Sequence, residues 1–232
     1  MIDCSIVIPI YNPQKDIADI MLQQYDGLLK AMPELSFELI IVDDGSVASV
    51  QPILDLLRNK FQIVKYIQHD RNRGKGKALR NGMLKTTGDI IVYTDYDFPY
   101  EVASMVNIIR SLQSSDNELA IGIRPESYYD KIPKNRKRLS KNLQRLNALL
   151  LKLPTGDTQA GLKAFTKNIK PLFLETTTDG FMFDLEFLKL AQGQKIKTTL
   201  VEIELRDDVI LSEVKTAHLI RELISYGRIL LR

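Results

Sequence analysis

The sequence predicts one α/β domain built on a mostly parallel sheet flanked by helices. Short β-branched apolar runs alternate along the chain with stretches whose apolar residues recur every three or four positions. This alternation is typical of βαβ units joined by right-handed crossovers. With 232 residues and a hydrophobic fraction of 44%, the chain has enough apolar material for one large core.

The predicted elements follow one another regularly. In the first half, strands are predicted at residues 5–10, 37–42, 63–67 and 90–93. The helices between them are predicted at residues 16–32, 50–57 and 76–85. In the second half, strands are predicted at 120–123, 162–165 and 198–205, and helices at 131–152 and 212–231. The last helix carries an apolar stripe, which indicates core packing or, alternatively, a membrane contact.

Composition excludes several kinds of site. The single cysteine, Cys4, rules out an internal disulfide and a cysteine-based zinc cluster, and the distance in sequence between His69 and His218 argues against a histidine metal site. The apolar start at residues 5–10 is too short for a signal peptide and contains Pro9, and no stretch has the length of a membrane span. We therefore expect a protein of the cytoplasm or of the cytoplasmic face of a membrane.

Two carboxylates follow the apolar run at residues 90–93. Asp95 and Asp97 stand one residue apart where a buried strand passes into a loop, and Pro99 ends regular pairing. Ligands of open α/β sheets bind beyond the carboxyl ends of strands. Two carboxylates at that place suit a divalent cation, Mg²⁺ or Mn²⁺, with positions left for substrate phosphates. The alternative is a solvated turn that contains two aspartates.

A second pair of acids, Asp43 and Asp44, follows the strand predicted at 37–42. A carboxylate at this edge can accept a hydrogen bond from a base N–H or a ribose hydroxyl. An ordinary strand-to-helix turn, with Ser46 as the helix cap, is the other interpretation.

The segment 69–80 combines two glycines with five basic residues, among them Lys75. Backbone N–H groups, a helix N-terminus and cations together favour an anion such as a diphosphate. The glycine spacing fits neither a P-loop nor a dinucleotide fingerprint. Taken alone, the segment is also consistent with a solvated basic helix start.

The combination of motifs resembles family 2 glycosyltransferases of the GT-A fold. The resemblance is carried by SIVIPIYN, IIVDDGS, NRGKGKALRNGMLKTTGD and IIVYTDYD in the first hundred residues. Two later segments, DTQAGLKAF at 157–165 and FMFDLEFL at 181–188, are similar to the branch that glycosylates polyprenyl phosphates, such as dolichyl-phosphate glucosyl- and mannosyltransferases. The resemblance covers about residues 3–205. It implies a nucleotide-binding half at about 1–97 and an acceptor-binding half at about 98–232.

The resemblance also implies roles for the matched residues. Asp44 contacts the nucleobase with Asp43 beside it, and the nucleoside pocket is lined by Pro9 and Tyr11. Asp97 is the firmer metal ligand, and Asp95 lies nearer the ribose and diphosphate. The donor sugar and the reaction centre are faced by Asp157 and Gln159. The family inverts the anomeric carbon by direct displacement, while the metal stabilises the departing diphosphate.

The charge of residues 131–152 indicates the acceptor. Eight lysines and arginines, no acid and interleaved leucines make this a basic amphipathic helix. Such a helix fits an anionic membrane surface and a polyprenyl phosphate, or it is a solvated helix over the core. Nucleic acid is not expected, because the aromatic residues of a stacking platform are missing. By resemblance, Arg124 and Arg138 match positions that bind the acceptor phosphate.

These observations predict an inverting hexosyltransferase that uses a UDP- or GDP-sugar and a polyprenyl phosphate. A phosphate monoester is already ionised at neutral pH, so it needs cations and no general base. One alternative is a family 2 enzyme acting on a saccharide hydroxyl, for which Asp157 would be the base. The other is a non-catalytic protein that binds nucleotide sugars.

Overall fold

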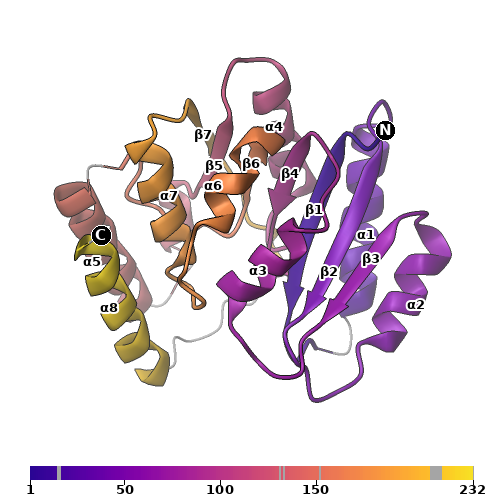
Figure 1. Ribbon diagram of the computed structural model, residues 1–232, viewed down its shortest axis with the longest axis horizontal. Coiled ribbons are helices and arrows are strands. Elements are labelled where there is room, and N and C mark those ends of the chain that lie inside the picture. The colour runs from indigo at the N-terminus through magenta and orange to yellow at the C-terminus, as the bar shows by residue number, and fades with distance from the viewer. Residues whose placement is uncertain (15–16, 131, 133, 152, 210–215, 232) are drawn as a thin grey trace.

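The computed structural model describes residues 1–14, 17–130, 132, 134–151, 153–209 and 216–231. In this part of the chain, seven strands form one sheet in the order β3-β2-β1-β4-β6-β5-β7 (Figure 1). All neighbouring strands are parallel except β6, which runs antiparallel to both β4 and β5. The strands are β1 Cys4–Ile10, β2 Phe37–Asp43, β3 Val64–Gln68, β4 Ile90–Tyr93, β5 Leu119–Ile123, β6 Lys163–Thr166 and β7 Thr198–Glu202.

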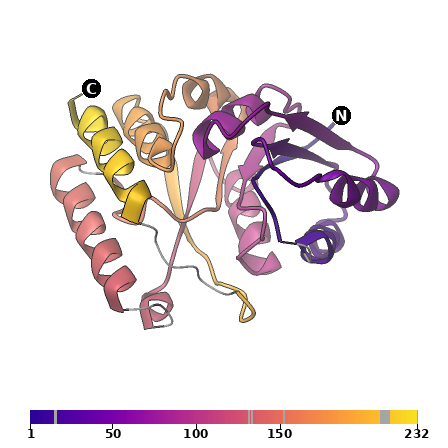
Figure 2. The ribbon, with the colours of Figure 1, turned by 90° about the horizontal axis from the view of Figure 1, so that it is seen from below.

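Helices cover both faces of the sheet. The α-helices are α1 Ile17–Ala31, α2 Gln51–Lys60, α3 Lys75–Met83, α4 Val102–Gln113, α5 Lys134–Leu151, α6 Lys170–Leu174, α7 Phe183–Gly193 and α8 Thr216–Leu231. Two short 3-10 turns are η1 Glu126–Asp130 and η2 Lys167–Ile169. Apolar residues of α1, α2 and α4 pack into one core, and those of α3, α6, α7 and α8 pack into a second core on the other face (Figure 2).

The predicted α/β architecture is confirmed, with local corrections. The strand predicted at 198–205 ends at Glu202, although Ile203 stays buried and Leu205 forms an isolated bridge with Tyr100. Helix α4 was not predicted, although its apolar residues recur at helical spacing. The predicted helix starts at 16 and 212–215, and residues 131, 133 and 152 of the predicted basic helix, lie outside the described residues.

Helices α7 and α8 hold each other's ends. The Glu222 carboxylate of α8 accepts hydrogen bonds from the backbone N–H groups of Phe181 (3.2 Å) and Met182 (3.0 Å), just before α7 begins. In return, the Lys189 ammonium of α7 donates to the Ile229 carbonyl at the end of α8, at 2.6 Å. Each side chain thus satisfies helix-end groups that the helix itself leaves unpaired. Both views also show α8 beside α5 (Figures 1 and 2).

Among the residues that the structure describes, no helix combines the length and the apolar character that a membrane crossing requires.

Candidate active site

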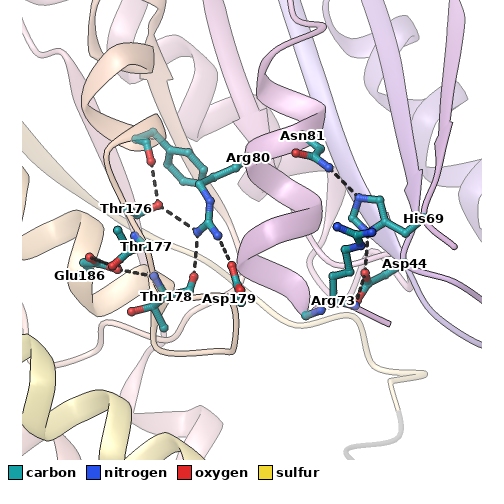
Figure 3. Close-up of polar contacts among 12 residues, drawn as sticks. Asp44, His69, Arg73, Arg80, Asn81, Thr176, Thr177, Thr178, Asp179 and Glu186 are labelled. Atoms are coloured by element: carbon teal, nitrogen blue, oxygen red, sulfur yellow. Dashed lines mark hydrogen bonds and ion pairs between the residues drawn. The ribbon is translucent and has the colours of Figure 1, made fainter. Parts of the chain in front are cut away.

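The carboxylate of Asp44, just beyond β2, is held almost entirely by the protein. It accepts hydrogen bonds from His69 Nδ1 at 2.7 Å and from the backbone N–H groups of Arg73 and Gly74, each at 2.8 Å (Figure 3). The other ring nitrogen of His69 lies 2.8 Å from the Asn81 side-chain amide on α3. These contacts fit a tautomer that donates from Nδ1 to Asp44 and accepts at Nε2 from Asn81. Asp44 therefore fixes the basic segment that follows β3.

Asp43 and the loops after β1 and β2 form the adjoining wall. The Asp43 carboxylate accepts from the Tyr66 hydroxyl (3.1 Å) and the Ser46 N–H (2.9 Å). Burial and the charge of Asp43 raise the pKa of Tyr66 to about 12. Ser46 does not cap a helix, since α2 begins only at Gln51, and its hydroxyl accepts from the Asn12 N–H at 2.9 Å.

The two residues expected to line a nucleoside lie on this same wall. Pro9 is buried within β1, and Tyr11, just after that strand, is 44% exposed. The loop that carries Tyr11 is tied to the loop after β2, because Val47 N–H donates to the Asn12 side chain at 2.9 Å. The strand ends of β1 and β2 thus present one continuous surface.

The glycine loop before α3 packs against a distant segment. Gly74 has a φ of +98°, and a Cβ there would lie 2.4 Å from the Asp179 carbonyl oxygen. The Gly76 N–H donates to that same oxygen at 2.8 Å. The sequence suggested that backbone N–H groups of this loop are exposed for an anion. Those of Arg73, Gly74 and Gly76 are instead bonded within the protein, so the side chains carry any anion binding.

Arg80 of α3 clamps the same distant segment, residues 176–180. Its guanidinium donates to the Thr178 carbonyl at 2.8 Å and forms an ion pair with Asp179 (Figure 3). From the other side, the Glu186 carboxylate of α7 accepts from the Thr177 and Thr178 N–H groups at 3.0 and 2.8 Å. Residues 176–180 are therefore held between Arg80 of α3 and Glu186 of α7.

Asp95 and Asp97 stand beyond β4, as predicted. Asp95 forms an ion pair with the Lys75 ammonium, and a Cβ on Gly161 would lie 2.1 Å from its Oδ2 atom. Burial, together with the charge of Asp95, raises the pKa of Asp97 to about 6. The crowding of two carboxylates fits a divalent cation, whose charge would relieve their repulsion. The described residues contain no group of three or more acidic, histidine or cysteine ligands, so ligand or water oxygens would complete its coordination.

Asp157 and Arg124 meet at the end of β5. Asp157 Oδ2 accepts from the Arg124 backbone N–H (2.9 Å) and Nε (3.0 Å), and the other carboxylate oxygen pairs with a terminal guanidinium nitrogen. The guanidinium also lies 4.7 Å above the Tyr128 ring. Burial alone would lower the pKa of Arg124, but Asp157 outweighs it and the pKa is raised. Two residues predicted separately, one for the reaction centre and one for the acceptor, are thus partners.

Gln159 and Arg138 take different positions. The Gln159 side-chain amide lies 3.7 Å from the Met182 sulfur, beside the segment that Glu222 holds. Arg138 is exposed on α5, on a different element from Arg124. The other face of α5 holds the 156–158 turn, since Asn147 Nδ2 donates to the Thr158 hydroxyl at 3.1 Å. Helix α5 therefore links the exposed basic surface to the loop of Asp157.

Beneath the site lies a buried ion pair to which sequence reasoning assigned no role. The fully buried Lys163 of β6 forms an ion pair with Asp184 of α7 at 2.9 Å, and the Tyr93 hydroxyl donates to Asp184 at 2.5 Å. Burial lowers the pKa of Lys163 despite the nearby carboxylate. A lysine inside an apolar strand was the available signal, because lysine is rarely fully buried without a partner.

Comparisons with known proteins bear on the family and the fold. The sequence model described as "Glycosyl transferase family 2" matches residues 5–170. Glycosyltransferase AglD of Haloferax volcanii is 26% identical over 236 residues, which cover 100% of this chain and 37% of that protein. The human dolichyl-phosphate beta-glucosyltransferase is 29% identical over 207 residues, covering 83% of this chain and 64% of that protein. The chain thus spans about a third to two thirds of these relatives.

Solved structures share the fold. Glucosyl-3-phosphoglycerate synthase of Mycobacterium tuberculosis, crystallised with UDP, has a TM-score of 0.72 at 17% identity, covering 99% of this chain and 79% of that chain. Mannosyl-3-phosphoglycerate synthase of Rubrobacter xylanophilus has a TM-score of 0.70 at 16% identity, covering 100% of this chain and 73% of that chain.

Proposed function

The chain belongs to glycosyl transferase family 2 and has the predicted GT-A fold, and on this premise we propose that it transfers a hexose from a nucleotide-diphosphate sugar to a polyprenyl phosphate, with inversion and with a divalent cation. The names of the curated relatives, which include dolichyl-phosphate beta-glucosyltransferases, support this acceptor class. In this proposal residues up to about 97 bind the donor, and the remainder binds the acceptor.

The pairing of Asp157 with Arg124 is the observation that carries the proposal. A saccharide hydroxyl needs a general base, and Asp157 is the candidate that the sequence offers. In the structure both oxygens of Asp157 already accept hydrogen bonds from Arg124. A hydroxyl proton could reach this carboxylate only by displacing a charge-assisted hydrogen bond from the guanidinium. An acceptor that is already ionised needs no base, and a guanidinium at the reaction centre suits it.

The donor side is proposed to work through Asp95 and Asp97. These carboxylates would hold Mg²⁺ or Mn²⁺, which supplies charge stabilisation for the departing diphosphate. Solved structures of the related fold contain these ions with UDP, which supports this choice. The nucleoside is proposed to lie along Pro9, Tyr11 and the Asp43–Asp44 pair. Lys75 contributes a cation beside the diphosphate, and Gln159 faces the sugar.

The acceptor lipid is proposed to enter from a membrane surface, with the protein bound peripherally at the cytoplasmic face. Arg138 and Arg145 are exposed on α5. Apolar side chains are exposed beside them, since Leu146 of α5 is 45% exposed and Ile224 of the neighbouring α8 is 55% exposed. Phe181, two residues before α7 begins, is 53% exposed. Cations next to exposed apolar side chains favour an anionic lipid surface.

The test is an acceptor comparison. Purified protein is assayed with UDP- and GDP-hexoses, Mn²⁺ or Mg²⁺, and three acceptors: a short polyprenyl phosphate, the matching free alcohol and a simple saccharide. We expect transfer to the phosphate only. Transfer to the alcohol or saccharide alone would overturn the acceptor and make Asp157 a base. Donor binding with no transfer to any acceptor would indicate the non-catalytic alternative.

A matched pair of variants tests the α5 surface. Arg138→Ala is expected to raise the apparent acceptor constant about 10- to 100-fold, because one charge-assisted contact to phosphate is lost. The donor constant is expected to stay unchanged. Arg110→Ala removes an exposed arginine on α4, on the opposite face of the sheet, and is the control. Binding to anionic liposomes should weaken with salt, since charges are screened over about 10 Å at 0.1 M.

A further inference from the structure

Glu222 of α8 is a buried carboxylate that is bonded to backbone groups of another element. It is 9% exposed, and its two oxygens each accept one hydrogen bond, from the Phe181 N–H at 3.2 Å and from the Met182 N–H at 3.0 Å. A glutamate is rarely this buried without compensating partners. Here the compensation comes from backbone donors at the start of α7, where the helix dipole also favours an anion.

The start of α7 depends on this carboxylate. Met182 occupies the N-cap position of α7, and its own side chain makes no capping hydrogen bond. A methionine offers only a weak acceptor, so Glu222 supplies the acceptor from α8. A Cβ on Gly180 would lie 2.4 Å from Glu222 Oε1, so the glycine leaves room for the carboxylate. Helix α8 therefore fixes the backbone from which the Met182 side chain extends.

The Met182 side chain carries this constraint into the site. It is 8% exposed, and its sulfur accepts a hydrogen bond from Gln159 Nε2 at 3.7 Å. Sulfur is a weak acceptor, so this contact orients the amide more than it immobilises it. Among the residues that the structure describes, it is the one hydrogen bond of the Gln159 side chain, which leaves the amide oxygen to accept from a ligand.

We propose that Glu222 is a positioning residue for the donor sugar, which acts through Met182 on the orientation of the Gln159 amide. The inference rests on the proposed function, in which Gln159 faces the sugar. An amide that is free to rotate must lose that freedom when it binds a sugar hydroxyl, and this ordering costs affinity. Glu222 reduces the cost without touching the substrate.

A second contact between the same helices separates positioning from simple helix docking. Lys189 of α7 donates to the Ile229 carbonyl near the end of α8, at 2.6 Å. The loss of either contact loosens α8 from α7. Only the loss of Glu222 removes the acceptor that holds the Met182 backbone, so only that loss should alter sugar recognition.

The experiment compares two ligands by isothermal titration calorimetry with Mn²⁺ present: UDP, which lacks the sugar, and UDP-glucose. GDP and GDP-mannose take their place if the protein binds guanine nucleotides. Glu222→Gln keeps the side-chain size but replaces one acceptor oxygen with an NH₂ group, which cannot accept from a backbone N–H. We expect its affinity for the nucleotide sugar to fall about three- to tenfold, the size of one hydrogen bond, and its affinity for the nucleotide to stay unchanged.

Lys189→Met is the matched control. Its Tm should fall as that of Glu222→Gln does, because both variants lose a contact between α7 and α8. Its affinities for the nucleotide and for the nucleotide sugar should both stay as in the wild type.

Two further measurements keep the test decisive if Glu222→Gln fails to fold. Met182→Leu keeps the apolar volume and both backbone bonds to Glu222 but removes the sulfur, so it should weaken nucleotide-sugar binding by a similar factor. Neither Glu222→Gln nor Met182→Leu should add to the loss that Gln159→Ala causes alone, because both act through Gln159. Additive losses, equal affinity shifts in Glu222→Gln and Lys189→Met, or an unchanged affinity in Met182→Leu overturn the inference.

Gln159→Ala and the transfer assay keep the two proposals distinguishable. A loss of nucleotide-sugar affinity in Gln159→Ala that is absent from Glu222→Gln and Met182→Leu leaves the proposed donor site standing and removes the positioning role. Losses in all three variants without transfer to a polyprenyl phosphate leave the positioning role standing and remove the proposed acceptor.

Discussion

At one end of the site a carboxylate is fixed mainly by the backbone, and at the other end two carboxylates are held by side-chain cations. Asp44 accepts two backbone N–H groups and an imidazole, and its side chain is 4% exposed. Asp95 is paired with Lys75 and Asp157 with Arg124, through long side chains from other elements. The first arrangement is part of the fold, whereas the second consists of charges that a bound anion or cation can rearrange.

This difference separates what shapes the site from what reacts in it. Asp44 determines the path of residues 69–74, so changing it alters the structure before it alters chemistry. The cations at the other end balance carboxylates that are needed for catalysis in the proposed function. Substitutions at the two ends should therefore affect stability and turnover in opposite proportions.

The largest effect is expected from Asp97→Asn, which damages the reacting end alone. An amide is a weaker cation ligand than a carboxylate, so we expect kcat to fall about 10²- to 10³-fold. The Tm at pH 7 should not fall, because burial and Asp95 disfavour the ionised form of Asp97. Steady-state kinetics and thermal unfolding measure both. Full activity in this variant, or in excess chelator, contradicts the proposed metal-dependent mechanism.

Asp44→Asn should damage the other end in the reverse manner. An amide cannot accept all the hydrogen bonds that Asp44 accepts, so we expect the free energy of unfolding to fall by about 1–3 kcal/mol. Urea unfolding measures this loss, and donor affinity should weaken with it. Asp70→Asn, at an exposed partner of Arg73, is the control and should leave stability unchanged. Normal stability with lost activity would show that Asp44 does not fix the path of residues 69–74.

Arg124→Lys sharpens the comparison because it keeps the charge and removes the two-pronged geometry. A lysine cannot donate to both oxygens of Asp157 in the manner of a guanidinium. We expect kcat/KM for the polyprenyl phosphate to fall about tenfold, the size of one lost charge-assisted hydrogen bond. The donor KM should remain as in the wild type. An equal rise in the donor and acceptor KM values would place Arg124 in the fold rather than at the acceptor.

The smallest effect is a pH dependence of cation binding. With a pKa of about 6, Asp97 is mostly ionised at pH 7 and half protonated at pH 6, so Mn²⁺ affinity should fall about twofold between them. The folded-state pKa lies above the ordinary 3.8, so the native state retains this proton longer than the unfolded chain. The free energy of unfolding of the metal-free protein should therefore decrease as the pH rises from about 4 to about 6. Asp97→Asn should remove that decrease.

The sequence predicted the features that depend on local pattern. Buried strands are continuous apolar runs, and the carboxylates that follow β2 and β4 are adjacent to those runs in the chain. Their shared edge follows from parallel pairing, which the alternation of strands and helices indicates. The same reasoning extended β7 to Leu205, because Ile203 and Leu205 remain apolar after regular pairing has ended.

The partners of the charged residues were not predictable in this way. Arg124 and Asp157 are 33 positions apart, and their contact depends on the antiparallel insertion of β6 beside β5. Lys163 and Asp184 meet for the same topological reason, since β6 brings the lysine beneath α7. The Gly76 N–H of the glycine loop donates to the Asp179 carbonyl about a hundred residues later. A periodic pattern identifies elements but carries no information about such distant pairs.

The reciprocal end-caps of α7 and α8 have a consequence for how segments of such chains are exchanged. Residues 171–232 lie beyond the matched family region, yet Glu222 holds the two residues before α7, one of which contacts Gln159. A Cβ at Gly180 would lie 2.4 Å from Glu222 Oε1, so a larger residue at this position would displace the Glu222 carboxylate. A chimaera that joins the sheet of this chain to the last helix of a relative must carry both, or it loses the alignment of Gln159.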